Sequence, residues 1–303
     1  MIDRPGIYTV SAAEYHQDPC IAPSLSASIA HILLTQSAWH AWWAHPRLNS
    51  AYQPQEDEKF DLGTAAHAYL LEGESGFVIV EASDWRTKAA REARAVARAA
   101  GKIPLLADRW GDVQGMALAA REQLAKHEDA PRPLADGKAE QTLVWQENGL
   151  WCRARLDWLH DDHRMIDDYK TTGASANPDV WTRALFGAGH DVQAAFYLRG
   201  LKALTGITAA FRFIVQETFT PYALSVIGLA PDALALAERK VQYALTLWRH
   251  CIELGEWPGY PRQTCWATAP AWEEARWGEQ EYRQKATIVD DGRPLADQLF
   301  GRP

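Results

Sequence analysis

"MIDDYKTTG" (residues 165–173) contains two adjacent aspartates, a lysine two positions after the second, and then two threonines. The stretch has the pattern of a β-strand, yet a buried strand avoids charge because an unpaired ion is costly to remove from water. Side chains alternate between the two faces of a strand. We therefore expect Asp168 and Lys170 on one face, and Asp167 and Tyr169 on the other.

The preceding stretch, "LWCRARLDWLH" (150–160), supplies another acid. Its alternation puts Asp157 on a polar face, and a turn near 161–163 would bring Asp157 beside Asp168. Two carboxylates so close repel unless a cation lies between them. Mg²⁺ is often held by one or two carboxylates together with a substrate phosphate.

This hairpin leaves two interpretations open. The first is a metal site that hydrolyses phosphodiesters, in which the metal lowers the pKa of a bound water and Lys170 positions that water. The second is an exposed ladder of ion pairs formed by Asp157, Asp168, Lys170 and Arg155.

The composition indicates a single globular domain over residues 1–303, because 47% of the 303 residues are hydrophobic and no repeat or flexible linker interrupts them. No apolar run has the roughly 18–20 residues that span a bilayer, and the N-terminus lacks a secretory pattern, so no membrane partner is expected. The four cysteines are scattered without a CxxC pair, which excludes an iron–sulphur cluster and favours a reduced, cytoplasmic setting.

The predicted elements alternate between helical and strand patterns. Helices are expected at 24–45, 60–74, 86–100, 109–127, 178–186, 189–204 and 231–254. Strands are expected at 141–146, 150–160, 164–170, 209–218 and 222–229, the first three as an antiparallel meander. The fold class is therefore α/β, a mixed central sheet flanked by helices with a helical N-terminal region, followed by a peripheral arm of little periodicity from about 255 to 303.

The net charge of −8 argues against a general electrostatic grip on nucleic acid, although a local one is possible. "WRTKAAREARAVARAAGK" (85–102) is basic, and its Arg91, Arg94 and Arg98 recur at helical spacing. They form either a solvated helix face or a stripe that contacts phosphates.

Tryptophan is unusually frequent, with 14 in the chain. Trp39, Trp42 and Trp43 would share one helix face, which is typical of a core or a subunit interface, although aromatic platforms also stack bases.

At this point the sequence resembles a known family. "RLD" at 155–157, followed by "DYKTT" at 168–172, resembles the PD-(D/E)xK nuclease core. "LGTAAH" (62–67) and "HDVQAAFY" (190–197) are similar to elements of the RecB-like branch. "SLSAS" (24–28), the basic stretch after Asp84, and "GEWPGYP" (255–261) with the following "APAW" are similar to RecE-type phage exonucleases, so the resemblance covers roughly residues 20–275.

The resemblance implies roles for particular residues. His67, Asp157, Asp168 and the backbone carbonyl of Tyr169 would hold the metal, and Lys170 would be the catalytic lysine. Gln193 and Tyr197 would orient the substrate phosphate or the attacking water. Contacts with DNA are expected from Arg91, Arg94, Arg98, Arg155, Thr171 and His190.

Two other acids lie near these motifs. Glu72 follows His67 by five residues, so on a helix it would be turned away from the site, and we do not include it. Glu140 opens the first strand of the meander, and whether it joins the site stays open.

The function implied by the resemblance is a Mg²⁺-dependent DNA exonuclease, with Mn²⁺ able to substitute, encoded by a phage or prophage. It would digest one strand of linear duplex DNA from the 5′ end and leave the 3′ strand for a single-strand annealing protein. A ring of three or four subunits is expected, because a basic stripe repeated around an axis lines a channel. The alternatives are another nuclease of the same fold, single-strand specific or endonucleolytic, and a catalytically silent DNA-binding protein.

Overall fold

The computed structural model describes residues 1–53, 61–73 and 77–287. The chain divides into two compact units, Met1–Gly259 and Tyr260–Pro303. The first unit contains the central sheet and all the predicted site residues, so the fold is described for that unit first.

A six-stranded sheet in the order β1-β4-β5-β6-β7-β8 forms the centre of the first unit. Its strands are β1 (Gly6–Tyr8), β4 (Gly137–Glu147), β5 (Leu150–His160), β6 (Met165–Thr172), β7 (Ala210–Glu217) and β8 (Leu224–Gly228). Strands β4, β5 and β6 form the expected antiparallel meander, whereas β6 and β7 are parallel. A parallel neighbour requires a crossover, and here it contains two helices. The predicted mixed α/β sheet is thus confirmed.

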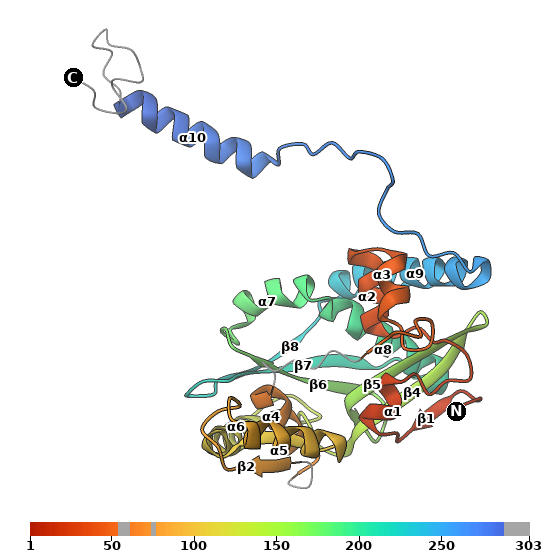
Figure 1. Cartoon of the computed structure of the whole chain (residues 1–303), viewed down its shortest axis with the longest axis vertical. Helices are drawn as coiled ribbons and strands as arrows, with labels where there is room; N and C mark the ends of the chain where they lie inside the picture. The colour runs from red at the N-terminus through yellow and green to blue at the C-terminus, as the bar shows by residue number, and fades with distance from the viewer. Residues whose placement is uncertain (54–60, 74–76, 288–303) are drawn as a thin grey trace. The chain divides into compact units, whose positions relative to one another are not determined.

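Helices cover both faces of this sheet (Figure 1). On one face lie α7 (Pro178–Gly187), α8 (His190–Thr205) and α9 (Pro231–Leu254), and on the other α4 (Asp61–Leu71) and α6 (Ala107–Ala125). The main core lies between the sheet and the first group, where Trp145, Phe196, Phe213 and Trp248 are fully buried. The predicted helices at 60–74 and 109–127 correspond to α4 and α6, and residues 60 and 74 lie outside the described residues.

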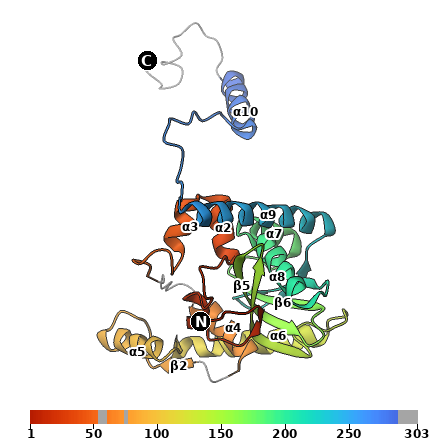
Figure 2. The ribbon, with the colours of Figure 1, turned by 90° about the vertical axis from the view of Figure 1, so that its right-hand side faces the viewer.

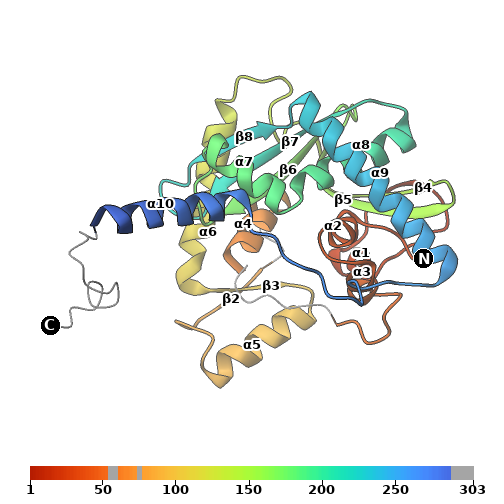
Figure 3. The ribbon, with the colours of Figure 1, turned by 90° about the horizontal axis from the view of Figure 1, so that it is seen from above.

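An outlying layer beside α4 and α6 was not fully expected (Figure 3). The basic stretch forms helix α5 (Lys88–Ala99), which packs on a small parallel pair of strands, β2 (Phe77–Val80) and β3 (Ile103–Leu106). Both strands have only four residues, too short to show a reliable alternation.

The N-terminal region corrects one prediction. The single helix expected at 24–45 is instead α2 (Ala27–Thr35) and α3 (Ala38–Ala44). The break occurs because Ser37 adopts an extended backbone and its hydroxyl accepts a hydrogen bond from the His40 amide, which starts a new helix. Before them lies a short helix, α1 (Ala12–His16), begun by a capping box between Ser11 and Glu14.

The tryptophans of α3 do not belong to the core. Trp39 and Trp43 are 54% and 57% exposed, while the buried residues of α3 are Ala38 and Ala41. The core interpretation of this stripe is therefore wrong for Trp39 and Trp43, and the subunit-interface interpretation stays a prediction.

The second unit contains helix α10 (Ala271–Thr287), where we expected an arm of little periodicity. The helix is rich in good helix formers and is reinforced by pairs one turn apart. Glu273 pairs with Arg276, and Trp277 donates a hydrogen bond to Glu281. Local pairing of this kind stabilises a helix without a hydrophobic stripe, so hydrophobic periodicity alone did not find it.

Candidate active site

The candidate site lies where β5 and β6 separate. Their ladder consists of the pairs Trp158–Asp167 and Leu159–Ile166, and the strands diverge beyond it. The amide of Tyr169 is therefore free of the ladder and donates a hydrogen bond to Asp157 Oδ2 at 2.8 Å. This fork brings Asp157 next to the segment that carries Asp168 and Lys170.

Strand β6 shows the expected alternation. Asp168 points toward α8, where Gln193 Nε2 donates a hydrogen bond to its Oδ1 at 2.7 Å. The Lys170 ammonium forms an ion pair with Oδ2 of the same carboxylate. Asp167 points the other way and pairs with Arg212 and His160.

His67 reaches the fork from α4. A side chain at Gly63 would place a Cβ only 2.4 Å from the Thr171 hydroxyl, so glycine is what allows α4 to approach β6 this closely. His67 Nε2 then lies 3.1 Å from Asp157 Oδ2, and its Nδ1 lies 3.7 Å from Glu140 Oε1. Thr171 thus supports the helix that carries His67.

Glu140, which the sequence left open as a site residue, lies next to His67 and Asp157. It lies opposite Asp157, between the paired residues Ala139–Trp158 and Gln141–Leu156, with a left-handed φ of 56°. One ligand atom from each of His67, Glu140 and Asp157 lies within 4.8 Å of the others. The hairpin register could have found Glu140, because the turn after Glu147 fixes which residue of β4 faces Asp157.

Burial and crowding separate the two aspartates electrostatically. Burial and the neighbouring Asp157 raise the pKa of Asp168 to about 7, although Lys170 opposes this. Burial also disfavours ionised Asp157, but His67, Lys170 and the Tyr169 amide outweigh it and lower its pKa. The two carboxylates interact closely, so they titrate as a pair.

The bases of the site respond in the opposite sense. Burial opposes protonation of His67, but Asp157 and Glu140 outweigh it and raise its pKa. Lys170 is likewise disfavoured by burial, yet Asp168 and Asp157 raise its pKa. The fork is therefore a site of excess negative charge that draws in positive charge.

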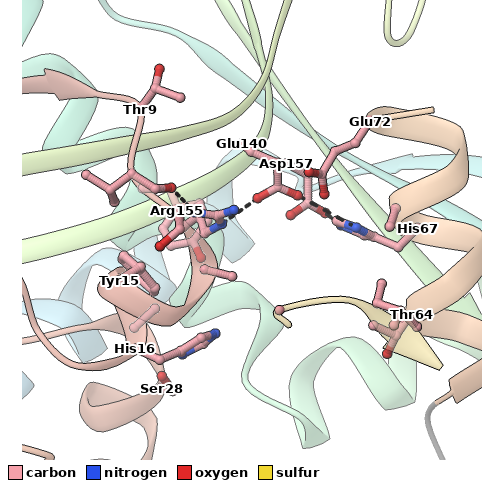
Figure 4. A pocket seen from close by; sticks show the side chains of 18 residues that line it. Thr9, Tyr15, His16, Ser28, Thr64, His67, Glu72, Glu140, Arg155 and Asp157 are labelled. Atoms are coloured by element: carbon pink, nitrogen blue, oxygen red, sulfur yellow. Dashed lines mark hydrogen bonds and ion pairs between the residues drawn. The ribbon is translucent and has the colours of Figure 1, made fainter. Parts of the chain in front are cut away.

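A cavity of about 790 Å³ opens on this cluster (Figure 4). One side carries His67, Glu140 and Asp157, and the other side carries Arg155 with His16 and Ser28. On this second side Arg155 belongs to β5, and the other residues come from the N-terminal segment, which Figure 2 shows next to α4, and from the start of α2. This wall was not predicted, because nothing local in residues 9–16 indicates a site.

Glu72 also lines the cavity, so our expectation that it turns away is wrong. Glu72 directly follows the end of α4 at Leu71, and its amide donates a hydrogen bond to the Ala68 carbonyl at 2.8 Å, so it closes the last turn of the helix at the edge of the cavity. It lies on the same side of the cavity as His67.

The remaining predicted residues occupy varied positions. Tyr197 is buried and lines the cavity, and burial raises the pKa of its hydroxyl, which keeps it protonated. His190 stacks on Trp181 with ring centroids 5.4 Å apart, and burial together with Lys170 lowers its pKa to about 4. Arg155 lines the cavity.

The three arginines of α5 do not share one open face. Arg91 is exposed, whereas Arg94 is only 6% exposed and lies over the Trp85 ring at 5.0 Å. Arg98 is half-buried between these extremes. The helix rotates Arg94 inward together with Ala90 and Ala97, so the spacing alone misjudged its exposure.

The donors at the fork fit a divalent cation. They combine one imidazole nitrogen with carboxylate oxygens, which suit Mg²⁺ or Mn²⁺ better than the softer metals. Asp168 Oδ2 is buried, and within the described residues its partner is the Lys170 ammonium, which forms an ion pair with it. A carboxylate oxygen has two lone pairs, so Asp168 Oδ2 can bind a cation in addition to Lys170.

A mixed sheet between helices, with acids on two neighbouring strands and a lysine two residues after the second acid, defines a protein of the PD-(D/E)xK nuclease class. Residues 40–267 match the family described as "PDDEXK-like domain of unknown function (DUF3799)", and the chain belongs to this family. This membership supports a nuclease.

Comparison with solved structures agrees on the fold. A crystal structure from Eubacterium rectale, described as a "putative exonuclease", matches with a TM-score of 0.56 at 12% identity, covering 90% of this chain and 100% of that chain. A second structure, that of SSO0001, covers 62% of this chain and 85% of its own at 15% identity, but its TM-score of 0.25 carries no weight. The search of curated proteins found no match. Of the helices in the described ranges, none has the length and apolar character needed to cross a membrane.

Proposed function

We propose that this protein is a Mg²⁺-dependent DNA exonuclease of the RecE type, with Mn²⁺ able to substitute. The observation that carries the proposal is the fork between β5 and β6, where Asp157, Asp168, Lys170 and His67 meet. Two of them, His67 and Asp157, line the cavity. Crowded acids with a neighbouring lysine suit phosphodiester hydrolysis, because the reaction needs a cation at the phosphate and a positioned donor beside it.

His67, Asp157, Asp168 and the carbonyl of Tyr169 would hold the cation. When bound, it would polarise the phosphate and lower the pKa of a water. The Lys170 ammonium, kept charged by its two acidic neighbours, would donate hydrogen bonds to the attacking water and to the charge that develops on the phosphate.

Gln193 and Tyr197 act from α8 in this proposal. Gln193 fixes the Asp168 carboxylate by its hydrogen bond, which holds that acid in one orientation. Tyr197, protonated and buried against the cavity, would donate to a phosphate oxygen. Arg155, on the opposite side of the cavity, would form an ion pair with a phosphate of the same DNA strand.

Contacts farther along the DNA are proposed for His190, Thr171 and the arginines of α5. Exposed Arg91 is best suited to reach a phosphate, and Arg98 is half-buried. Arg94 would act by holding Trp85 and the helix in place. Phosphate contacts supply affinity that falls with salt, so these residues affect binding rather than chemistry.

The exonuclease activity, its 5′ polarity and its role in recombination rest on the RecE resemblance, together with the fold shared with a protein described as a "putative exonuclease". In this proposal the protein works in the bacterial cytoplasm on double-stranded DNA ends and passes the 3′ strand to a single-strand annealing protein. It forms a ring of three or four subunits, for which exposed Trp39 and Trp43 are candidate contacts.

The test is an assay on linear duplex DNA labelled at either the 5′ or the 3′ end, with Mg²⁺ and with EDTA. Release of 5′-terminal nucleotides only with Mg²⁺, and none from closed circles, supports the proposal. Lys170→Met should bind Mn²⁺ but lose cleavage by about 10²–10³-fold, as for other single charge-stabilising donors. Cutting of closed circles or of single strands alone would favour a different nuclease, and no hydrolysis under any condition would favour the silent DNA-binding protein.

A further inference from the structure

Glu140 and Glu72 are acids of the cavity to which the proposed function gives no role, and of these Glu140 lies next to His67 and Asp157. Glu140 occupies a strand position with a φ of 56°, a conformation that residues other than glycine rarely adopt. Such strained residues cluster at functional sites, where the surrounding structure maintains them. Here the strained backbone presents Glu140 directly opposite Asp157.

The two carboxylate oxygens of Glu140 face different partners. Oε2 accepts a hydrogen bond from Arg155 Nε in an ion pair, whereas Oε1 lies 3.7 Å from His67 Nδ1. Glu140 therefore stands between a fixed cation of the protein and the ligand atoms that would hold a metal.

The Arg155 guanidinium has donors that could bind another partner. Its Nη1 donates to the carbonyl of Val10 at 2.6 Å, which ties the guanidinium to the N-terminal wall of the cavity. In the described part of the chain no acceptor is hydrogen-bonded to Nη2. A guanidinium presents several donors in a rigid fork and is well suited to phosphate oxygens.

We propose that Glu140 is a further ligand of the divalent cation and that Arg155 competes with the cation for it. Without the cation, Arg155 neutralises Glu140 and limits the repulsion among the acids of the fork. Once the cation takes over Glu140, the guanidinium is free to bind a phosphate of the DNA strand. This last step rests on the proposed function, whereas the competition itself does not.

The competition makes a prediction opposite to that of a structural role. If Arg155 only supports the site, its removal weakens metal binding. If it competes for Glu140, its removal releases a carboxylate to the cation and strengthens binding. The effect must also vanish when Glu140 is no longer a carboxylate, which a double-mutant cycle measures.

The experiment is a calorimetric titration of Mn²⁺ into the full-length protein without DNA. Glu140→Gln should raise the dissociation constant by about tenfold, as expected for loss of one ligand or its close support. Arg155→Gln should lower it by about threefold to tenfold, since a competing charge a few ångströms away is removed. The double variant should bind like Glu140→Gln, because the gain from losing Arg155 needs the carboxylate.

Arg199→Gln is the matched control. Arg199 also forms an ion pair with a glutamate of β4, Glu147, but neither residue lines the cavity. Its metal affinity should equal that of the unaltered protein. Thermal unfolding of each variant reports whether it folds, and if Arg155→Gln does not, Arg155→Lys replaces it, with a smaller increase in affinity expected.

Unchanged or weaker Mn²⁺ binding in the folded Arg155 variant overturns the inference, as does an equal gain in the Glu140→Gln background. Because no DNA is present, a protein that binds Mn²⁺ as described but does not cut DNA refutes the proposed function alone. If the protein cuts DNA but its Mn²⁺ affinity is unchanged by the Arg155 substitution, this inference alone is refuted.

Discussion

Asp167 and Asp168 are adjacent on β6 and fully buried, but their surroundings differ completely. Asp167 is bonded on both oxygens: Arg212 donates to both, the Leu134 amide donates to Oδ2, and His160 Nε2 lies 2.7 Å from Oδ2. Burial opposes its ionisation, but these partners outweigh burial and lower its pKa.

Asp168 has fewer partners and a second carboxylate nearby. It contacts Lys170 and Gln193, yet burial and Asp157 raise its pKa to about 7. The partners of Asp167 outweigh the cost of its burial, whereas Lys170 only partly offsets burial and repulsion at Asp168, so a bound cation would stabilise its charge. Under the proposed function, this difference between two neighbouring residues separates a structural charge from a functional one.

The largest expected effect is the loss of DNA cleavage when an acid of the fork is neutralised. Asp157→Asn or Asp168→Asn should reduce cleavage of linear duplex by about 10³-fold or more, since each removes charge that the cation requires. Thermal unfolding of Asp168→Asn in EDTA should show equal or greater stability, because burial and Asp157 disfavour the charge that this substitution removes. Asp168→Asn with unaltered Mn²⁺ affinity would contradict the assignment of this residue.

Substitution of Asp167 should instead reduce stability and change cleavage little. Asp167→Ala leaves Arg212 and His160 buried without their partner, and the free energy of unfolding should fall by about 3–5 kcal/mol. Urea denaturation measures this loss, and the cleavage rate of the folded fraction should change far less than in Asp168→Asn. A stable Asp167→Ala protein with lost cleavage would reverse the two roles.

The pH dependence of stability sharpens the comparison in the metal-free protein. The pKa of Asp167 is lowered on folding, so its stabilisation is complete above the unfolded pKa of about 4 and is lost as the pH falls through the folded value. The folded pKa of Asp168, about 7, is raised, so the contribution of Asp168 to the stability of the wild type falls as the pH rises from about 4 toward 7.

Urea titrations between pH 3 and pH 8 measure how the free energy of unfolding changes with pH and so separate the contributions of Asp167 and Asp168. Between pH 4 and pH 7, the free energy of unfolding of Asp168→Asn should rise relative to that of the wild type by up to about 1.4 kcal/mol per pH unit. The loss of unfolding free energy caused by Asp167→Asn should instead become smaller below about pH 4, where the wild-type Asp167 is also neutralised. Parallel profiles for the two variants would mean that the two carboxylates do not differ as described.

The smallest expected effect concerns Tyr169, which shares a face with Asp167. Its hydroxyl donates to Gln216 Oε1, and the Gln216 amide donates to the carbonyls of Met116 and Tyr222. Tyr169→Phe leaves a buried acceptor unpaired and should cost about 1–3 kcal/mol of stability. Cleavage by the folded protein should change little, whereas Tyr197→Phe, in the cavity, should lower cleavage with less effect on stability.

Sequence patterns alone located much of the fold and part of the site. Alternation along β5 and β6 identified the meander, the faces of Asp167 and Asp168, and the approach of Asp157 to Asp168. These features are local, since a strand's period and a short turn fix which side chains share a face. His67 came from the resemblance of "LGTAAH", and the structure adds that Gly63 lets its helix approach β6.

Tertiary structure decided what depends on distant segments. Glu140 enters the site through the register between β4 and β5 and a left-handed backbone, and the N-terminal segment lines the cavity from more than a hundred residues away in the chain. The place of Glu72 in the cavity depended on which segments surround the end of α4, and the burial of Arg94 on how α5 packs. Residue spacing sets which side chains share a face, but only packing between elements determines what that face meets.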